Sequence, residues 1–178
     1  LMAFTVDRAA MLERFQTYCR IDTKSEETSE TCPSTEKQKD LSRLLVDELQ
    51  ALGLSNAEMD EYGYVYATLP ENFPADHPRR GKARAFGLIA HVDTAPAVSG
   101  KDVNPVVHRN YQGGPITLPA DESIVLTPET DAPLGECVGH DIVTADGTTL
   151  LGADNKAGIA EIMTGLQALV NHPEILHG

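Results

Sequence analysis

The stretch Ala85-Phe86-Gly87-Leu88-Ile89-Ala90-His91-Val92-Asp93-Thr94 decides the fold that we predict for this chain. Residues 85–92 are almost continuously apolar, which is typical of a strand covered on both faces of a sheet. We therefore expect a central strand here. His91 and Asp93 stand two residues apart at its end, so their side chains leave the same face of an extended chain. Because α/β sheets bind ligands at the carboxyl ends of their strands, the stretch also predicts a site.

A second motif, Leu150-Leu151-Gly152-Ala153-Asp154-Asn155-Lys156-Ala157-Gly158, follows about sixty residues later. Its Asp154 stands where an apolar run gives way to a helix, since apolar residues repeat at three and four over 159–170. A cation held by His91 and Asp154 would then lie at the end of a strand. Both side chains are of types that bind zinc. Lys156 is expected to be an ordinary solvated lysine at the start of the helix.

Both motifs also have purely structural explanations. His91 and Asp93 could be a hydrogen-bonded pair at a strand end, and Asp154 could be a helix N-cap. On spacing alone these explanations are the stronger ones. Gly152 and Lys156 favour the metal site, because they allow a tight turn that points the carboxylate outward beside a positive charge. A carboxylate in that position could bridge two zinc ions through its two oxygens.

The rest of the chain alternates predicted helices and strands, which indicates an α/β fold with helices packed on a sheet. Residues 94–140 contain six of the eleven prolines, so we expect a long segment without one regular element. The Asp146-Gly147 pair predicts a hairpin turn. The other expected elements are helices over 7–20 and 33–53, strands over 56–60 and 63–69, and a hairpin over 142–151.

Composition narrows the class of protein. The 178 residues are 41% hydrophobic, enough for a buried core, and their formal net charge of −13 argues against nucleic acid or an anionic membrane as a partner. No segment has the ~18 consecutive apolar residues of a membrane span. Three cysteines without a CxxC pair indicate reduced thiols, and residues 1–8 do not resemble a signal peptide. We therefore expect a cytoplasmic protein.

Taken together, several motifs resemble the M20 family of co-catalytic zinc metallopeptidases, and within it the tripeptide aminopeptidases. The resemblance covers nearly the whole chain and is carried by Pro33–Glu36, Tyr66–Pro70, His91–Thr94 with Ser99–Lys101, Asn110–Gly114 and Thr149–Met163. It implies a zinc-peptidase (phosphorylase/hydrolase-like) fold with three α/β/α layers around a mixed sheet, incomplete at the C-terminal side. Residues 1–178 would form the N-terminal part of the catalytic domain, without the lid and dimerisation domain.

The resemblance also implies roles for individual residues. His91 would be a ligand of one zinc, Asp154 the carboxylate that bridges two zincs, and Asp93 the catalytic aspartate that clamps the His91 ring. Asn155 departs from the family, which usually has a second aspartate there. The family's catalytic glutamate and remaining ligands lie at positions that would follow Gly178.

The implied activity is the release of the N-terminal residue from tripeptides with a free amino group, by a homodimer in its full-length form. We expect the chain by itself to bind zinc weakly, to hydrolyse nothing, and to self-associate through an unpaired sheet edge or apolar surface. Two alternatives remain at this point. One is an M20 dipeptidase or N-acyl-amino-acid amidohydrolase, and the other is a noncatalytic α/β binding module in which Asp154 only caps a helix.

Overall fold

Three long helices form the body of the molecule, and all three were predicted. A computed structural model describes residues 6–178, so residues 1–5, part of the region where we predict no signal peptide, lie outside it. The helices are α1 (Arg8–Arg20), α2 (Gln38–Ala51) and α4 (Ala153–Asn171). The Asp7 carboxylate caps α1 by accepting from the Ala10 N–H at 3.0 Å. Gly53 follows α2 with φ +94°, a conformation that favours glycine at a helix end.

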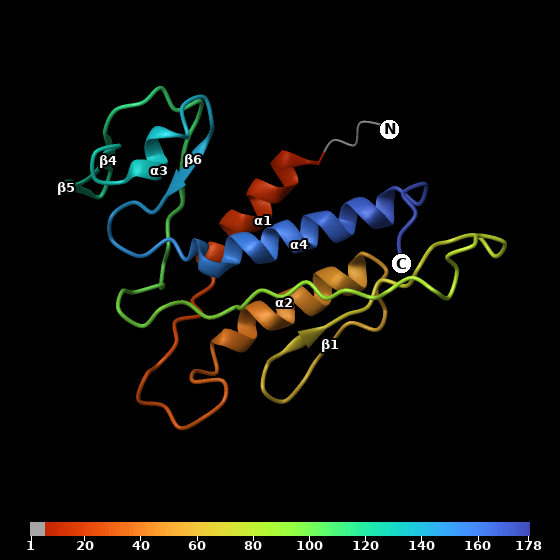
Figure 1. The fold of residues 1–178 in the computed structure, drawn as a ribbon. Coiled ribbons are helices and arrows are strands. Elements are labelled where there is room, and N and C mark those ends of the chain that lie inside the picture. The colour runs from red at the N-terminus through yellow and green to blue at the C-terminus, as the bar shows by residue number, and fades with distance from the viewer. Residues whose placement is uncertain (1–5) are drawn as a thin grey trace.

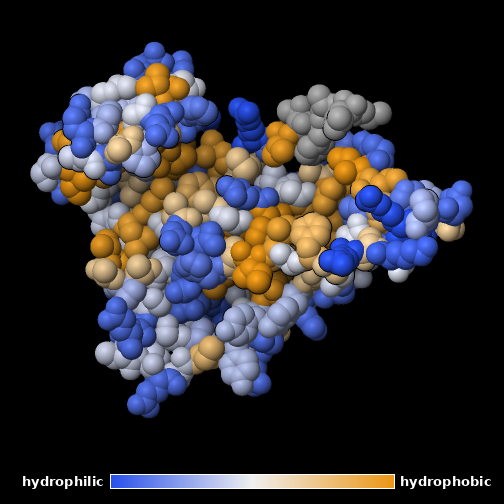
Figure 2. Space-filling model, viewed as in Figure 1, coloured by the Kyte–Doolittle hydropathy of each residue, from blue (hydrophilic) through white to orange (hydrophobic). Residues whose placement is uncertain are grey.

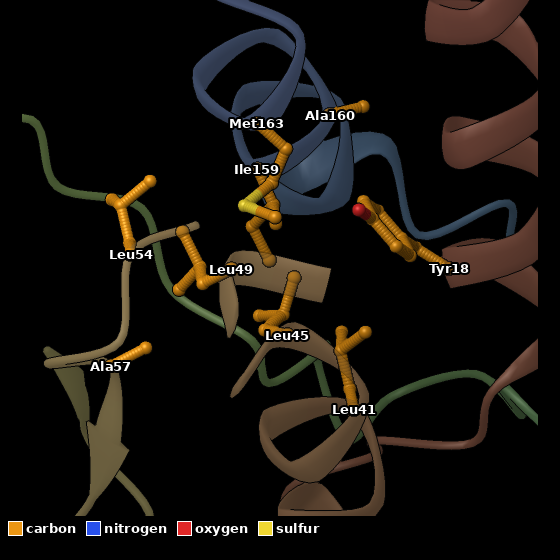
Figure 3. Close-up of a cluster of buried hydrophobic side chains, with 9 residues drawn as sticks. All are labelled: Tyr18, Leu41, Leu45, Leu49, Leu54, Ala57, Ile159, Ala160 and Met163. Carbon is orange, nitrogen blue, oxygen red and sulfur yellow. The ribbon is translucent and has the colours of Figure 1, made fainter. Parts of the chain in front are cut away.

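The main core lies where these helices meet. In Figure 1, α1 and α4 run side by side while α2 lies below α4. Leu41, Leu45 and Leu49 recur every four residues on α2 and so present one apolar face. Burial of each such leucine contributes about 1.5–3 kcal/mol. Figure 3 shows the whole cluster, which is made of Tyr18, Leu41, Leu45, Leu49, Leu54, Ala57, Ile159, Ala160 and Met163.

A polar network joins the same three helices. Arg14 on α1 donates to Glu48 Oε2 on α2 at 3.1 Å and to Gln167 Oε1 on α4 at 2.7 Å. The Tyr18 hydroxyl donates to the same Glu48 oxygen at 2.8 Å. Burial and the Glu48 carboxylate raise the pKa of Tyr18 well above its usual range, so the hydroxyl keeps its proton. An apolar core and the Arg14–Glu48 ion pair beside it thus hold the three helices together.

The strands are short and form three separate antiparallel pairs. They are β1 (Glu58–Met59) with β2 (Val65–Tyr66), β3 (Val106–His108) with β6 (Ile142–Thr144), and β4 (Ile116–Leu118) with β5 (Asp121–Leu126). A four-residue helix, α3 (Ala132–Gly135), lies near the last pair. The chain is therefore a mixed α/β protein, as predicted at the coarse level. A single mixed sheet is not formed among residues 6–178.

The prediction of a buried central strand over 85–92 is wrong for this structure. Phe86 and Ile89 are 75% and 93% exposed, and among residues 6–178 no strand pairs with the run. Near the end of the run, Ala90 and Val92 are partly buried and pack against the main core. In Figure 1 the trace of this run crosses in front of the helices. Figure 2, in the same view, shows an apolar surface across the middle of the molecule. A strand's backbone groups need neighbouring strands, and residues 6–178 do not supply them here.

The segment over 94–140 is more regular than predicted. It contributes β3, β4, β5 and α3, and a second small core of Tyr111, Ile116, Leu118 and Leu134. The predicted hairpin over 142–151 is wrong, because β6 pairs with the distant β3. Gly147 (φ +110°) instead packs closely on Asp121, and Asp146 O accepts from the Ala120 N–H at 2.9 Å. Along residues 6–178, no helix has both the length and the apolar character needed to span a membrane.

Candidate metal centre

The His91 ring lies between two carboxylates. Its Nδ1 is 3.0 Å from Asp93 Oδ1 and also 3.0 Å from the Asp93 carbonyl oxygen. Its Nε2 is 2.9 Å from Asp154 Oδ1. The fold thus brings together the three residues that the sequence singled out, although Asp154 follows His91 by 63 positions. His91 is 51% exposed and Asp154 is 94% exposed, so the pair opens to solvent.

Thr94 fixes the strand-like end that carries His91 and Asp93. Its N–H donates to Thr23 O at 3.1 Å, and its carbonyl oxygen accepts from the N–H of Ser25 at 3.0 Å and from the hydroxyl of Ser25 at 2.8 Å. Lys24 and Thr94 form a parallel bridge. The apolar run has no strand partner in the part of the chain that the structure describes, yet the residue that follows its end, Thr94, is hydrogen-bonded to the segment after α1.

A tight turn positions Asp154. Gly152 has φ +80°, and a Cβ there would lie 3.2 Å from Thr94 Cγ2 and 3.3 Å from Leu150 Cδ1. Asp154 and Asn155 keep non-helical dihedral angles, so the regular part of α4 begins at Lys156. No hydrogen bond joins the Asp154 carboxylate to a backbone N–H of α4 among the described residues, so the N-cap explanation for Asp154 is wrong. Its carboxylate faces His91 instead.

Lys156 is almost completely buried, with 1% of its surface exposed. Its Nζ donates to Ile21 O at 2.7 Å. Burial lowers the pKa of Lys156, and the nearby Cys19 and Asp22 oppose that shift. The expectation of a solvated lysine is therefore wrong. A signal was present in the sequence, since Lys156, Ile159, Ala160 and Met163 follow the spacing of one buried helical face.

The electrostatics of His91 favour a positive charge at this position. Partial burial alone would lower its pKa, but the hydrogen bond to Asp154 and the charge and hydrogen bonds of Asp93 outweigh it and raise the pKa above its usual value. Each ring nitrogen then faces an oxygen acceptor. A divalent cation could take the place of the Nε2 proton between His91 and Asp154, with Asp93 still holding Nδ1.

The donor set fits part of a zinc site. Imidazole and carboxylate are the right types of ligand, and their donor atoms point at each other. Two ligands are fewer than the three that a catalytic zinc usually takes from its protein. Within residues 6–178, no group of three or more histidine, cysteine, aspartate or glutamate side chains is placed to hold a metal. None of the other histidines joins the pair, and His108 instead contacts Thr144 Oγ1 at 3.0 Å.

The fold and this pair define an α/β protein with a candidate metal-binding site made of one histidine and its facing carboxylates. No family model matches the chain. It is similar to proteins named peptidase T, with 51% identity over 168 residues to that of Bacillus pumilus, 49% to that of Bacillus subtilis and 52% to that of Alkaliphilus oremlandii. Each match covers 94% of this chain and 40% of the relative. The chain thus spans about two fifths of the length of these curated relatives, and the predicted resemblance to an aminopeptidase family is confirmed as a similarity to proteins named peptidase T.

Proposed function

We propose that this chain is part of a zinc-dependent aminopeptidase that releases the N-terminal residue of tripeptides. The observation that carries the proposal is the His91 ring held between Asp93 and Asp154, in a chain half identical to proteins named peptidase T. A peptidase is the general activity that those names support. Zinc dependence and tripeptide specificity go one step further and rest on the resemblance of the motifs.

In this proposal each residue of the pair has a separate task. His91, through Nε2, and the Asp154 carboxylate would be the residues of this chain that hold zinc. Asp93 would accept a hydrogen bond from the Nδ1–H, which fixes the tautomer of the ring and makes Nε2 a better electron-pair donor to a metal. Zinc, when bound, supplies a Lewis acid that polarises the peptide carbonyl and lowers the pKa of water. Asp154 is 94% exposed, so a substrate could approach its carboxylate from the solvent.

The fold and the partners belong to the same proposal. Residues 1–178 would be the N-terminal part of a catalytic domain with a three-layer α/β/α fold, in which the run over 85–92 becomes a central strand once neighbours pair with it. Short peptides with a free N-terminus would be the substrates, a homodimer the full-length form, and the cytoplasm the location. The long exposed apolar run supports this view, because such a run is suited to burial between strands.

Zinc titration tests the metal site. We expect calorimetry of the 178-residue chain to give weak zinc binding that falls at least about tenfold in His91→Ala, since loss of a ligand costs more than loss of a partner behind it. His140→Ala is the matched control, because this histidine is also exposed but lies outside the site. Zinc uptake that is equal in wild type and His91→Ala would favour the noncatalytic binding module.

Hydrolysis assays test the activity. The chain alone should cleave no tripeptide, because it provides only His91 and Asp154 as ligands, and measurable cleavage would contradict this part of the proposal. A chimera in which the remaining residues of Bacillus subtilis peptidase T follow Gly178 should cleave tripeptides, and Asp93→Ala should reduce its rate strongly. Preference of the chimera for dipeptides or N-acyl amino acids would instead favour the other M20 activities.

A further inference from the structure

One short segment contacts both halves of the candidate site. Residues 21–25 follow α1, and the backbone of Thr23 and Ser25 holds Thr94, the neighbour of Asp93. The carbonyl oxygen of Ile21, in the same segment, accepts the hydrogen bond from Lys156 Nζ. Residues 21–25 therefore fix the positions of both Thr94 and Lys156, which lie far apart in the sequence.

Lys156 follows Asp154 closely along the chain. It is the first residue of the regular part of α4, two positions beyond Asp154. On the other side of Asp154, Gly152 packs against Thr94. The Asp154 side chain is 94% exposed, and among the described residues its carboxylate hydrogen-bonds to the His91 ring alone. Its position therefore depends on how Gly152 and Lys156 hold the backbone on either side of it.

Stability alone does not explain a lysine at this position. The other buried residues of the same helix face, Ile159, Ala160 and Met163, are apolar, and burial takes hydration away from the Lys156 ammonium. Apolar side chains of similar size often replace buried charged groups without loss of stability. A charged donor with a long reach does, however, bind a backbone carbonyl more strongly than a neutral donor. The geometry therefore favours a role in placing the turn before α4.

We propose that Lys156 is a positioning residue for metal binding, which holds Asp154 against His91 through its hydrogen bond to the Ile21 carbonyl. The inference rests on the proposed zinc-binding role of that pair. Lys156 itself touches neither His91 nor the place between the two donors. Its effect on the metal passes through the backbone of residues 154–156 alone.

Lys156→Met tests this role, because methionine matches the apolar stem of lysine as far as Cε and removes the donor. Zinc and cobalt are titrated into the 178-residue chain by calorimetry and by absorption, well below the unfolding temperature. We expect about tenfold weaker binding, the size of effect seen when a partner behind a metal ligand is lost. The midpoint of thermal unfolding should stay the same or rise. Wild-type affinity in this variant would overturn the proposal.

Three further variants separate positioning from general damage. Lys156→Arg keeps a charged donor and should recover part of the affinity. Arg14→Met removes another largely buried cation between α1 and α4, far along the helix from Asp154, and should lower stability without changing metal affinity. If Lys156→Met loses its helical circular dichroism, Lys156→Gln takes its place. This side chain is one bond shorter, so weaker metal binding is again expected, and wild-type affinity again overturns the proposal.

The two proposals fail in different ways. If His91→Ala binds zinc as well as wild type, the proposed metal site itself is wrong. If His91→Ala loses binding while Lys156→Met keeps it, only the role of Lys156 is wrong. Side-chain nitrogen NMR of His91 adds a readout that needs no metal. The Nε2 signal should change in Lys156→Met and stay unchanged in Arg14→Met, and an unchanged signal in both would contradict the positioning role.

Discussion

The helical body and the run over 85–92 are both rich in apolar residues, yet they end in opposite environments. Leu41 on α2 is 0% exposed, whereas Ile89 in the run is 93% exposed. A helix satisfies its own backbone hydrogen bonds and needs only one covered stripe. A strand needs neighbours along both edges before burial becomes favourable. Apolar composition therefore indicates a tendency to be buried, and the availability of partners decides whether burial occurs.

The largest expected difference between the two regions is in the free energy of unfolding that is lost when an apolar side chain is truncated. Leu41→Ala should lower the free energy of unfolding by about 3 kcal/mol, because it leaves a cavity among tightly packed residues. Ile89→Ala should change it by less than about 0.5 kcal/mol, because Ile89 contacts mainly water. Urea unfolding followed by helical circular dichroism measures both values. Similar losses in the two variants would show that the run is buried in solution.

A smaller effect is expected on association of the chain with itself. The exposed run should pair two or more copies, and Ile89→Lys should weaken that association at least about tenfold, since one buried isoleucine contributes about 1.5–3 kcal/mol. Val138→Lys is the matched control, because Val138 is another exposed apolar residue, at 54%, that lies outside the run. Sedimentation velocity over a range of concentrations gives the result. A wild-type chain that stays monomeric throughout would show that the run does not pair.

The smallest expected effect concerns Asp22, at the junction of the two regions. Burial alone would raise its pKa, but the hydrogen bond from Lys37 Nζ at 2.8 Å, the Lys24 N–H, and the charges of Lys37 and Lys156 lower it. A lowered pKa in the folded state stabilises the fold above the usual aspartate value of about 3.9. That contribution is lost as the pH falls through the lowered value.

Asp22→Asn should therefore reduce stability at neutral pH by less than about 1 kcal/mol, the usual range for a partly exposed ion pair. The difference from wild type should disappear in acid. Asp40→Asn, which breaks the more exposed pair with Arg43, should have no measurable effect at either pH. Urea unfolding at neutral and acidic pH measures both variants. A difference for Asp22→Asn that persists in strong acid would contradict the assigned cause.

The sequence predicted the helices better than the strands for a physical reason. The leucines of α2 and the apolar residues of α4 show their spacing within a few turns, so local pattern is sufficient. The pairing of β3 with β6 joins residues more than thirty positions apart, and the alternation of a single strand does not identify its partner. The Asp146-Gly147 pair predicted a hairpin, but no strand lies between Gly147 and α4, and β6, which precedes the pair, joins the distant β3.

The site was predictable in its side chains and less so in its supports. His91, Asp93 and Asp154 were identified from residue type and from the motifs around them, and the structure brings them together. Their roles toward a metal stay predictions. Lys156 was assigned to solvent because a lysine near a helix start is usually exposed. Its burial depends on the Ile21 carbonyl, which belongs to a segment whose position no local pattern specifies.

The path of the chain between the two site motifs has one further consequence. The Leu150 N–H donates to Ser99 O at 3.0 Å, so residues 100–149 leave the helical body and return to the same point. They carry their own small core and lie to one side of the helices in Figure 1. A unit whose ends meet can be lengthened, shortened or exchanged at small cost in chain entropy. Residues 100–149 can therefore be replaced by a segment of another length or sequence, while the geometry of His91 and Asp154 stays the same.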